Sequence, residues 1–196
     1  MKILHLSDTH TRHRALGNLP EADVVVHSGD FCMVGGEKEA IDFLNWFCDL
    51  PYAHKIFICG NHDTCLFGSK ISGLDDNTHY LCSSGITIEC VKFYGVPMFI
   101  HDCTIGRQRY YAQIPRDTDV LITHQPPYGI LDLDNGFNYG DEQLLFKVTE
   151  VQPLLHLFGH IHRQHGVVSE LGIIFSNGAV ICNDDSLPSP LNIFEL

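Results

Sequence analysis

The feature that most constrains the fold is a series of five short polar clusters, each placed directly after a run of apolar residues. The clusters consist largely of Asp, Asn and His side chains, with glycine beside several of them. In α/β proteins the carboxyl ends of neighbouring strands meet at one edge of a sheet, where separate segments can point polar groups at one place. The clusters therefore predict an α/β fold with a site at its strand ends. They are Asp8-Thr9-His10, Gly29-Asp30, Gly60-Asn61-His62-Asp63, Thr123-His124 and Gly159-His160-Ile161-His162.

The first third of the chain alternates short apolar runs with one amphipathic segment. Ala40, Ile41, Leu44 and Phe47 recur at helical spacing, and Pro51 follows, which predicts a helix over Glu37–Leu50. This alternation favours parallel strands joined by crossover helices. The strands are expected at Lys2–Leu6, Asp23–His27 and Lys55–Cys59.

The remaining chain predicts a second helix and more strands, and thus two sheets with helices outside. Residues 64–80 are polar and are expected to form a loop with one helical turn. Asp141 and Glu142 in a first turn, with Pro153 after the last, predict a helix over Asp141–Val151. Strands are expected at Ile86–Val91, Val96–Ile100, Val120–Thr123 and Leu154–Phe158, followed by a meander of Gly166–Val168, Gly172–Phe175, Ala179–Cys182 and Asn192–Phe194, with a polar turn near Asp184–Pro190.

Length and composition indicate a single domain over residues 1–196. The 196 residues, 44% of them hydrophobic, suffice for a sizeable core. The segment Met1-Lys2-Ile3-Leu4 is too short for a signal peptide, and no apolar stretch approaches the roughly 18 residues that span a bilayer. Eight Cys without a C-x-x-C pair favour a reduced, cytoplasmic setting, and no membrane partner is expected. Oligomeric state is left open.

The formal charge of −12 argues against a long nucleic acid as partner, because a phosphate backbone requires a basic surface. A small phosphorylated substrate is compatible with this charge. Two divalent metals bring about four positive charges, and the clusters offer only Asp8 and Asp30 as carboxylates expected to bind them. With metals present, the site is therefore locally cationic inside an acidic protein.

The spacing within the first and last clusters places two metal-binding side chains on one side of an extended segment. Residues two apart in such a segment project to the same side. A carboxylate oxygen of Asp8 and an imidazole nitrogen of His10 can then share one cation, and His160 and His162 repeat the spacing.

The middle clusters supply ligands of other kinds. Asp30 follows Gly29, which permits a tight turn. The two carboxylate oxygens of Asp30 can bridge two metals about 3.5–4 Å apart. Asn61 offers a carbonyl oxygen and His124 a nitrogen. Oxygen and nitrogen ligands without thiolate suit Mn, Fe or Zn and do not choose among them.

Each cluster taken alone has an ordinary explanation. Asp-x-His is a common pattern, and Gly-Asp and Gly-Asn-His-Asp are typical of turns. His124 before Gln125-Pro126-Pro127 suits a plain loop, and Gly-His-Ile-His suits a surface position. The ordered conjunction of all five at strand ends favours a two-metal hydrolytic centre. Other hydrolase signatures, namely H-E-x-x-H, G-x-S-x-G and a P-loop, do not occur in the sequence.

The same clusters resemble the signature of the calcineurin-like metallophosphoesterase superfamily. That signature reads D-x-H, G-D, G-N-H-[DE], a lone H and G-H-x-H, and here it spans Asp8 to His162. The chain is also similar to the branch of metallophosphoesterase-domain proteins related to class III cyclic nucleotide phosphodiesterases. Some animal members of that branch lack the first His of the last block, which is His160 here. This narrower resemblance rests on His27-Ser28-Gly29-Asp30-Phe31, Leu50-Pro51-Tyr52 and Thr123-His124-Gln125-Pro126-Pro127-Tyr128-Gly129.

The resemblance implies an αββα sandwich of two sheets and a pair of divalent metals. His62 would protonate the leaving oxygen, held in place by Asp63. Metals of this kind lower the pKa of a bound water and so provide a hydroxide that attacks phosphorus in line. The implied ligands are Asp8, His10, Asp30 and His162 for one metal, and Asp30, Asn61, His124 and His160 for the other.

Residues outside the signature have weaker indications of a role. Arg12, His13 and Arg163 can reach a phosphate or base, or can be solvated loop residues. Tyr128 follows His124 and can line a specificity pocket. A stretch with Arg107, Arg109, Tyr110 and Tyr111 can stack a nucleobase or pack at the surface. His5 and His27 lie within apolar runs and are expected to be core histidines whose hydrogen bonds are satisfied.

The leading hypothesis is a binuclear-metal-dependent phosphoesterase that hydrolyses a small phosphodiester or phosphomonoester, with nucleotides among its candidate substrates. One alternative is a catalytically weak metal-binding scaffold on the same fold. That alternative is disfavoured because no signature residue, including His62, is missing. Protein phosphatase activity is a further alternative, which the sequence does not separate from the first. Substrate, metal identity and physiological role are not encoded in the signature.

Overall fold

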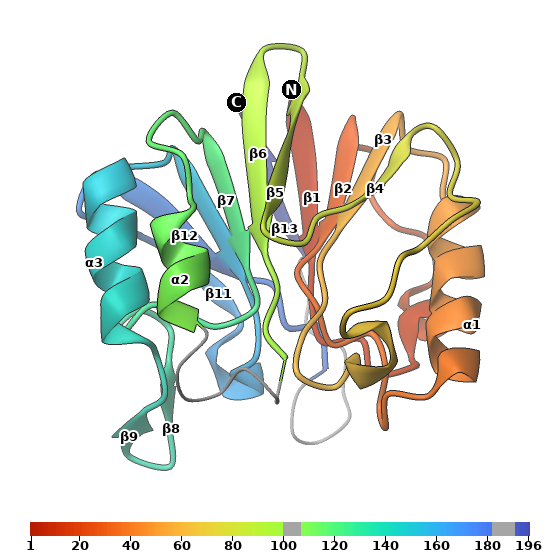
Figure 1. Cartoon of the computed structure of the whole chain (residues 1–196), viewed down its shortest axis with the longest axis horizontal. Coiled ribbons are helices and arrows are strands. Elements are labelled where there is room, and N and C mark those ends of the chain that lie inside the picture. The colour runs from red at the N-terminus through yellow and green to blue at the C-terminus, as the bar shows by residue number, and fades with distance from the viewer. Residues whose placement is uncertain (100–106, 182–190) are drawn as a thin grey trace.

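Two β-sheets pack face to face, with helices on the outer side of each (Figure 1). This computed structural model describes residues 1–99, 107–181 and 191–196. The expected two-sheet α/β sandwich is therefore confirmed. Within the described residues, no helix combines the length and apolar character needed to cross a bilayer.

The first sheet has the order β13-β1-β2-β3-β4. Its four N-terminal strands run parallel, and the C-terminal strand joins the edge antiparallel to β1. Strands β1 and β2 are buried along almost their whole length, which explains their continuous apolar sequence. The strands are β1 (Lys2–Leu6), β2 (Val24–His27), β3 (His54–Phe57), β4 (Thr78–Tyr80) and β13 (Asn192–Glu195).

The second sheet has the order β11-β12-β10-β7-β6-β5, and its four central strands are parallel. The outermost strands, β5 and β11, are antiparallel to their neighbours. A small hairpin of β8 (Leu133–Asp134) and β9 (Phe137–Asn138) extends beside this sheet. The sheet strands are β5 (Ser84–Ile88), β6 (Val91–Val96), β7 (Val120–Thr123), β10 (Leu155–Phe158), β11 (Gly166–Glu170) and β12 (Ile173–Asn177).

The helices cover the outer sheet faces with their apolar sides. Helix α1 (Glu37–Cys48) buries Phe43 and Phe47 against the first sheet. Helices α2 (Arg107–Ala112) and α3 (Glu142–Val151) lie on the second sheet. The Asp141 carboxylate caps α3 by accepting hydrogen bonds from the N–H groups of Gln143 and Leu144, as its position before the helix suggests.

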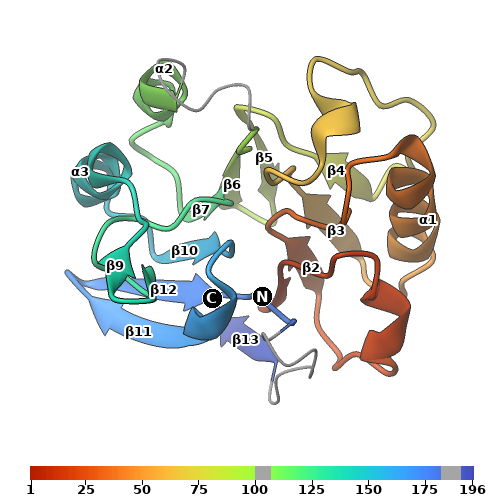
Figure 2. The ribbon, with the colours of Figure 1, turned by 90° about the horizontal axis from the view of Figure 1, so that it is seen from below.

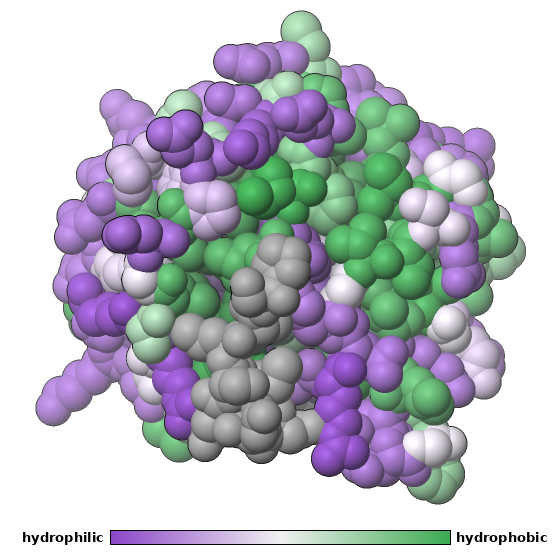
Figure 3. All heavy atoms as spheres, turned by 180° about the vertical axis from the view of Figure 1, so that it is seen from behind, coloured by the Kyte–Doolittle hydropathy of each residue, from purple (hydrophilic) through white to green (hydrophobic). Residues whose placement is uncertain are grey.

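A continuous apolar layer between the sheets holds their strand ends in register. Val24 and Ile56 of the first sheet share this layer with Val120, Ile122 and Leu157 of the second, and all are fully buried. Burying one such side chain contributes about 1.5–3 kcal/mol. Figure 2 looks onto the lower edge of Figure 1, where the carboxyl ends of the parallel strands from both sheets come together. Seen from behind, the surface alternates polar areas with apolar patches (Figure 3).

The expected strand pair Ile86–Val91 and Val96–Ile100 was wrong in its register. The structure forms the β5–β6 hairpin instead, and the chain turns at Glu89 and Cys90, which adopt positive φ angles of 46° and 71°. The apolar run conceals this turn because neither residue is Gly or Asn. Ile100 lies outside the described residues.

The expected C-terminal meander was also wrong. Strands β11 and β12 form a hairpin, whereas β13 leaves this sheet and pairs with β1. Ala179 makes a single bridge to Ser7 and is not part of a strand. Cys182 and residues 184–190 lie outside the described residues. Helix α2, strand β4 and the β8–β9 hairpin are short elements that the sequence pattern did not predict.

Candidate metal centre

All five polar clusters lie at one edge of the two sheets, directly after β1, β2, β3, β7 and β10. Four of their residues adopt the left-handed backbone region, with φ angles of 55° at Asp8, 40° at His10, 58° at Asp30 and 70° at His160. This conformation is uncommon for residues other than glycine and persists only where the surroundings enforce it. Four such residues at one edge indicate a site where the required side-chain geometry outweighs the cost of a strained backbone.

The first group of candidate ligands joins both ends of the signature. Asp8 and His10 follow β1, and His162 follows β10. The His162 Nε2 atom lies 3.4 Å from Asp8 Oδ1 and 3.1 Å from His10 Nε2. The ligand atoms of these three residues all lie within 4.8 Å of one another. One ion can therefore contact all three.

A second group of candidate ligands also lies close together in space. Asp30, His124 and His160 also place their ligand atoms within 4.8 Å of one another. The His124 Nε2 atom lies 3.1 Å from Asp30 Oδ2 and 3.9 Å from Asp8 Oδ1, so the two groups are adjacent. Asn61 lines a cavity together with Asp30 and His160, and its Oδ1 is buried without a hydrogen-bond partner among the described residues.

The hydrogen bonds behind the rings fix which nitrogens face the centre. His10 Nδ1 donates to the Cys32 carbonyl at 3.0 Å, and His124 Nδ1 donates to the Ser28 carbonyl at 2.9 Å. A neutral imidazole that donates through Nδ1 presents a lone pair at Nε2. Both Nε2 lone pairs thus point at the centre, which is the arrangement that a cation requires.

The charges within the centre also fit metal ions. Burial lowers the pKa of His124, but the Asp30 and Asp8 carboxylates outweigh it and raise the pKa to about 9. A divalent cation can replace that proton between the ring and the carboxylates. Burial and the neighbouring His124 lower the pKa of His160 to about 4, which keeps its ring neutral and available as a ligand. Asp8 Oδ1 is buried without a hydrogen-bond partner among the described residues, and His124 Nε2 faces Asp30 Oδ2. The donor set therefore fits two divalent ions.

Two glycines allow the strand ends to approach this closely. A Cβ atom at Gly29 would lie 2.7 Å from the Gly60 nitrogen and 2.8 Å from His124 Nδ1. A Cβ atom at Gly60 would lie 2.2 Å from Asp30 Oδ1. Any side chain at either position would force the β2, β3 and β7 ends apart, so the glycines are part of the geometry of the site.

Asp63 was expected to hold the His62 ring in place. In the structure it instead accepts hydrogen bonds from backbone N–H groups of the loops around the centre. Its fully buried carboxylate accepts hydrogen bonds from the N–H groups of Asp30 at 2.8 Å, Gly60 at 2.8 Å and Cys32 at 2.9 Å. It thereby ties the loop after β2 to the loop after β3. Burial and the nearby Asp30 charge raise the pKa of Asp63 to about 8, while the N–H donors oppose this shift.

His62 lies at the open side of the centre. Its backbone N–H donates to Asp30 Oδ1 at 2.7 Å, and its ring Nδ1 donates to the Met33 carbonyl at 2.6 Å. The ring centroid is 4.8 Å from that of His10, nearly perpendicular to it. The Met33 carbonyl thus takes the role that the sequence assigned to Asp63. A backbone carbonyl has no residue signature, so sequence reasoning missed it.

A cavity of about 270 Å³ opens over the centre. Arg163 lines it as expected, and its guanidinium lies 3.2 Å from Asn135 Oδ1 and 3.6 Å from Asp134 Oδ1 at the β8–β9 hairpin. Sequence reasoning missed Asp134, which has no motif around it. The described residues that line the cavity are Asp30, Asn61, His62, Asp134, His160, Ile161, His162 and Arg163.

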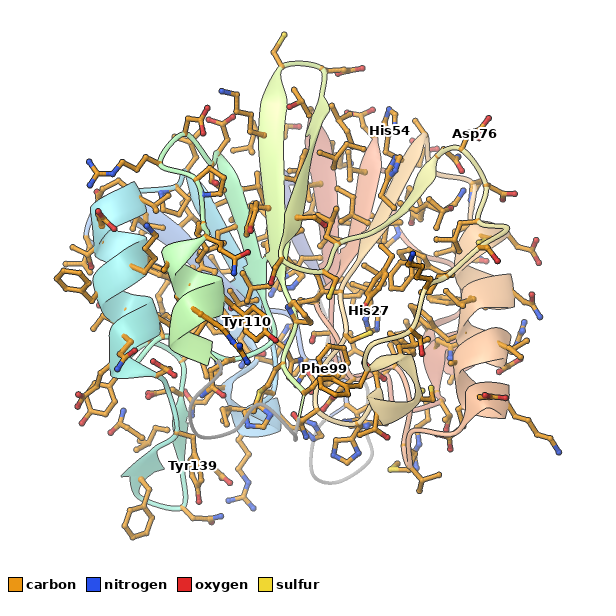
Figure 4. All side chains as sticks on the ribbon, viewed as in Figure 1. His27, His54, Asp76, Phe99, Tyr110 and Tyr139 are labelled. Atoms are coloured by element: carbon orange, nitrogen blue, oxygen red, sulfur yellow. The ribbon has the colours of Figure 1, made fainter. Side chains whose placement is uncertain are left out.

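Other expected substrate contacts are not brought to this cavity. His13 is buried, its ring centroid lies 4.9 Å from that of Trp46, and its Nε2 lies 3.1 Å from an Asp42 carboxylate oxygen on α1, so the structure does not bring it to the cavity. Arg12 and Tyr128 are not among the described residues that line the cavity. Of the expected stacking residues, Tyr111 is buried against α3 and Tyr110 lies on the helix α2 (Figure 4). The side chain of Arg107 lies outside the described part of the chain.

The core histidines are as predicted. His5 is fully buried between Ser176 Oγ at 2.8 Å and Ser28 Oγ at 2.9 Å. His27 ends strand β2 of the first sheet (Figure 4), and its Nε2 atom lies 3.0 Å from the Thr9 hydroxyl oxygen. Burial lowers the pKa of His27 to about 3, so it stays neutral. The bond to Thr9 places His27 directly behind the Asp8-Thr9-His10 segment.

The chain is similar to known proteins over most of its length. Residues 1–164 match the family model described as calcineurin-like phosphoesterase. The Caenorhabditis elegans UPF0046 protein K07C11.7 is 34% identical over 206 residues, which cover 93% of this chain and 70% of that protein. The human metallophosphoesterase domain-containing protein 1 is 33% identical over 215 residues, which cover 91% of this chain and 66% of that protein.

Solved structures share the fold at low sequence identity. The crystal structure of TT1561 of Thermus thermophilus superposes with a TM-score of 0.58 at 13% identity, covering 90% of this chain and 88% of that one. GAP50, the anchor in the inner membrane complex of Plasmodium, has a TM-score of 0.56 at 11% identity, covering 92% of this chain and 71% of that one. The solved structures agree in fold, and the family match over residues 1–164 shows that the chain belongs to the calcineurin-like phosphoesterase family.

Proposed function

We propose that the protein is a two-metal phosphoesterase that hydrolyses a small phosphodiester or phosphomonoester, with nucleotides among the candidate substrates. One observation carries this proposal. Two adjacent groups of ligands, Asp8-His10-His162 and Asp30-His124-His160, lie beneath a cavity that His62 borders. A metal-binding scaffold without turnover needs the two groups but has no use for a further histidine at the cavity mouth.

Each metal would have a defined set of ligands. Two divalent ions, when bound, supply positive charge that stabilises the phosphoryl oxygens and makes water a better nucleophile. The carboxylate of Asp30 would be shared between the two sets, because its Oδ2 lies 3.1 Å from His124 Nε2 and it also offers an oxygen within 4.8 Å of the ligand atom of His10. Asp8, His10, His162 and Asp30 would hold one ion, and Asp30, Asn61, His124 and His160 the other.

His62 would deliver the proton to the leaving oxygen. Its Nδ1 donates to the Met33 carbonyl, so in the doubly protonated ring Nε2 carries the second proton, on the side of the substrate. Its ligand atom lies within 4.8 Å of those of His10 and Asp30. A proton held at this place reaches the ester oxygen of a phosphate seated over the centre.

The cavity and its charge suit a small anionic ester. A volume of about 270 Å³ accommodates a phosphate and part of its leaving group. The Arg163 guanidinium at the cavity wall can pair with a phosphate oxygen. A net charge of −12 outside the site disfavours extended nucleic acids.

A leaving-group comparison with the metal-reconstituted protein tests this function. We expect hydrolysis of both nitrophenyl and alkyl phosphate esters, and the ratio of bis- to mono-ester turnover gives the preferred class. His62→Ala, with metal content unchanged, should slow alkyl ester hydrolysis by about 10²–10⁴-fold, because general acid catalysis is lost. Nitrophenyl ester hydrolysis should fall much less, since its leaving group needs little protonation.

His54 provides a matched control, because it lies at the start of β3, away from the centre (Figure 4). His54→Ala should leave both rates unchanged. Equal rates for His62→Ala and the unaltered protein on alkyl esters would rule out the assigned acid. No hydrolysis of any ester in a panel of cyclic dinucleotides, cyclic mononucleotides and nucleoside monophosphates, with metals bound, would favour the scaffold alternative.

A further inference from the structure

A single carboxylate accepts hydrogen bonds from the loop that contacts the His62 ring. Glu39 lies in the first turn of α1, and its Oε2 atom accepts hydrogen bonds from three consecutive backbone N–H groups. These come from Met33 at 3.1 Å, Val34 at 3.0 Å and Gly35 at 3.1 Å. The donors outweigh desolvation and hold the pKa of Glu39 below its ordinary value, so the carboxylate is charged at neutral pH.

The same loop is in direct contact with His62. The Met33 carbonyl accepts the hydrogen bond from His62 Nδ1 at 2.6 Å. Gly35 packs on the next segment, where an added Cβ would lie 2.7 Å from the His62 carbonyl oxygen. Its φ angle of +77° is one that glycine adopts without strain. The His62 ring is therefore linked to this loop by a hydrogen bond to the Met33 carbonyl.

Apolar packing contributes little to holding this loop. The Met33 side chain is 46% exposed and that of Val34 is 80% exposed. Neither side chain can anchor the backbone by burial. Charge-assisted hydrogen bonds to one carboxylate oxygen are stronger than neutral ones. Glu39 thus restrains the peptide that carries the Met33 carbonyl, through the Val34 N–H, while Asp63 holds the N–H of the preceding Cys32.

We propose that Glu39 is a positioning residue for the proton donor: through the Met33 carbonyl, it fixes the His62 ring so that Nε2 points at the leaving oxygen. This inference rests on the proposed function for its catalytic consequence. Without Glu39 the loop gains freedom, and the ring samples orientations in which Nε2 misses the ester oxygen. Misplacement of a reacting group by about 1 Å can cost up to about 100-fold in rate.

Glu39 has a second, purely structural explanation that the test must separate. A glutamate in the first turn of a helix also stabilises the helix through its dipole. Glu37 shares that first turn and is exposed, and no hydrogen bond links it to the Met33–Gly35 loop among the described residues. Glu37→Ala is therefore a matched control, which loses the dipole term and keeps the loop restraint.

The experiment compares Glu39→Ala, Glu39→Gln and Glu37→Ala in the full, metal-reconstituted protein. Glu39→Ala should lower kcat for an alkyl phosphate ester by about 10- to 100-fold, with KM and nitrophenyl ester turnover nearly unchanged. Glu39→Gln should recover most of this loss, because its amide oxygen still accepts the backbone N–H groups. Glu37→Ala should match the unaltered protein on both substrates.

A spectroscopic measurement makes the result independent of turnover. The ring nitrogens of His62, assigned by comparison with His62→Ala, should give one sharp set of NMR signals in the unaltered protein and in Glu37→Ala. In Glu39→Ala these signals should broaden or split. Unchanged His62 signals, or equal losses on alkyl and nitrophenyl esters, would overturn the proposal. If the unaltered protein hydrolyses no ester, the proposed function fails, while the NMR comparison still decides whether Glu39 positions the ring.

Discussion

The inner and outer parts of the site are built in different ways. The inner part contains Asp8, Asp30 and His124, which are buried at strand ends; backbone N–H groups hold the two carboxylates, and a backbone carbonyl holds the His124 ring. The outer part contains His62 and Arg163, which exposed loops carry. The difference teaches that the metal-binding geometry is fixed by the fold, whereas proton delivery and substrate contact depend on a few loop hydrogen bonds. Selectivity can therefore change without disturbing the chemistry of the inner part.

The largest effect should come from the shared inner ligand. Asp30→Ala removes a carboxylate that borders both ligand groups, so we expect loss of both metals and of all phosphoesterase activity. Asp30→Asn keeps one oxygen ligand without the charge and should retain at most partial metal content. Elemental analysis with activity assays measures both. Full retention of two metals in Asp30→Ala would contradict the bridging role.

Each part of the site has one buried aspartate that holds a loop by accepting backbone hydrogen bonds, and we call these two residues the inner and outer clamps. Asp63 accepts three backbone hydrogen bonds in the inner part, and Asp132 accepts hydrogen bonds from Gly129 and Gly140 at 2.9 Å in the outer hairpin. A hydrogen bond of this kind contributes about 0.5–1.5 kcal/mol, and each variant also leaves backbone N–H groups without their acceptor, so Asp63→Ala and Asp132→Ala should both lower thermal stability.

Only the inner clamp should matter for metal binding. Loss of a residue that supports metal ligands typically costs about 10- to 100-fold in metal affinity, which we expect for Asp63→Ala. Asp132→Ala should leave metal affinity unchanged, because the carboxylate of Asp132 contacts the hairpin and not the ligands. Isothermal titration with Mn²⁺ or Zn²⁺ separates the two. Equal losses of affinity in both variants would remove the distinction between inner and outer parts.

A smaller effect is expected from the cavity wall. Arg163→Ala should raise KM by about 10-fold with little change in kcat, since one charge-assisted contact to the substrate is lost. Metal content should not change. Arg116, which pairs with Glu150 on α3, provides the control because Arg116→Ala removes a surface ion pair and neither of these residues lines the cavity. A fall in kcat alone for Arg163→Ala would mean that Arg163 acts in the chemical step and not in binding.

The smallest effect concerns stability and pH, away from the cavity. His156 is fully buried beside the Thr123 hydroxyl, and burial lowers its pKa to about 3, whereas an exposed histidine has a pKa of about 6.5. The unfolded chain therefore binds a proton at His156 that the folded chain rejects between these two values. Its stabilising contribution is complete above pH 6.5 and falls by about 1.4 kcal/mol per pH unit toward pH 3.

Urea unfolding of metal-free protein at several pH values measures this slope. His156→Gln keeps a hydrogen-bonding side chain but does not titrate, so its stability should depend on pH less steeply, by one proton. His5 and His27 are also buried and neutral and should leave a residual slope in this variant. An unchanged slope in His156→Gln would show that the histidine titrates normally in the folded state.

Sequence reasoning was most successful where residue identity determines position. The strand–turn–ligand pattern placed Asp8, Asp30 and His124 at one sheet edge because buried parallel strands end together. It failed where backbone atoms perform the role. The carbonyls of Ser28, Cys32 and Met33 orient the histidine rings, and a carbonyl leaves no signature in the sequence.

The pairing of strands far apart in the sequence could not be predicted from local sequence patterns either. Strand β13 was expected to follow Ala179–Cys182 in a meander but pairs with β1, at the other end of the chain. The apolar alternation of a short strand defines which face is buried and not which neighbour it chooses. His13 illustrates the same limit for side chains. Its place close to His10 in the sequence suggested the cavity, yet the turn at His13–Leu16 directs it toward Trp46 and Asp42 on α1.

The claim on which the function depends is that the separate clusters hold a pair of metal ions around Asp30. A crystal of the protein soaked in Mn²⁺ and measured by anomalous scattering tests it directly. We expect two anomalous peaks about 3.5–4 Å apart, with the Asp30 carboxylate between them. A single peak, or peaks that the Asp30 side chain does not contact, would contradict the two-metal centre.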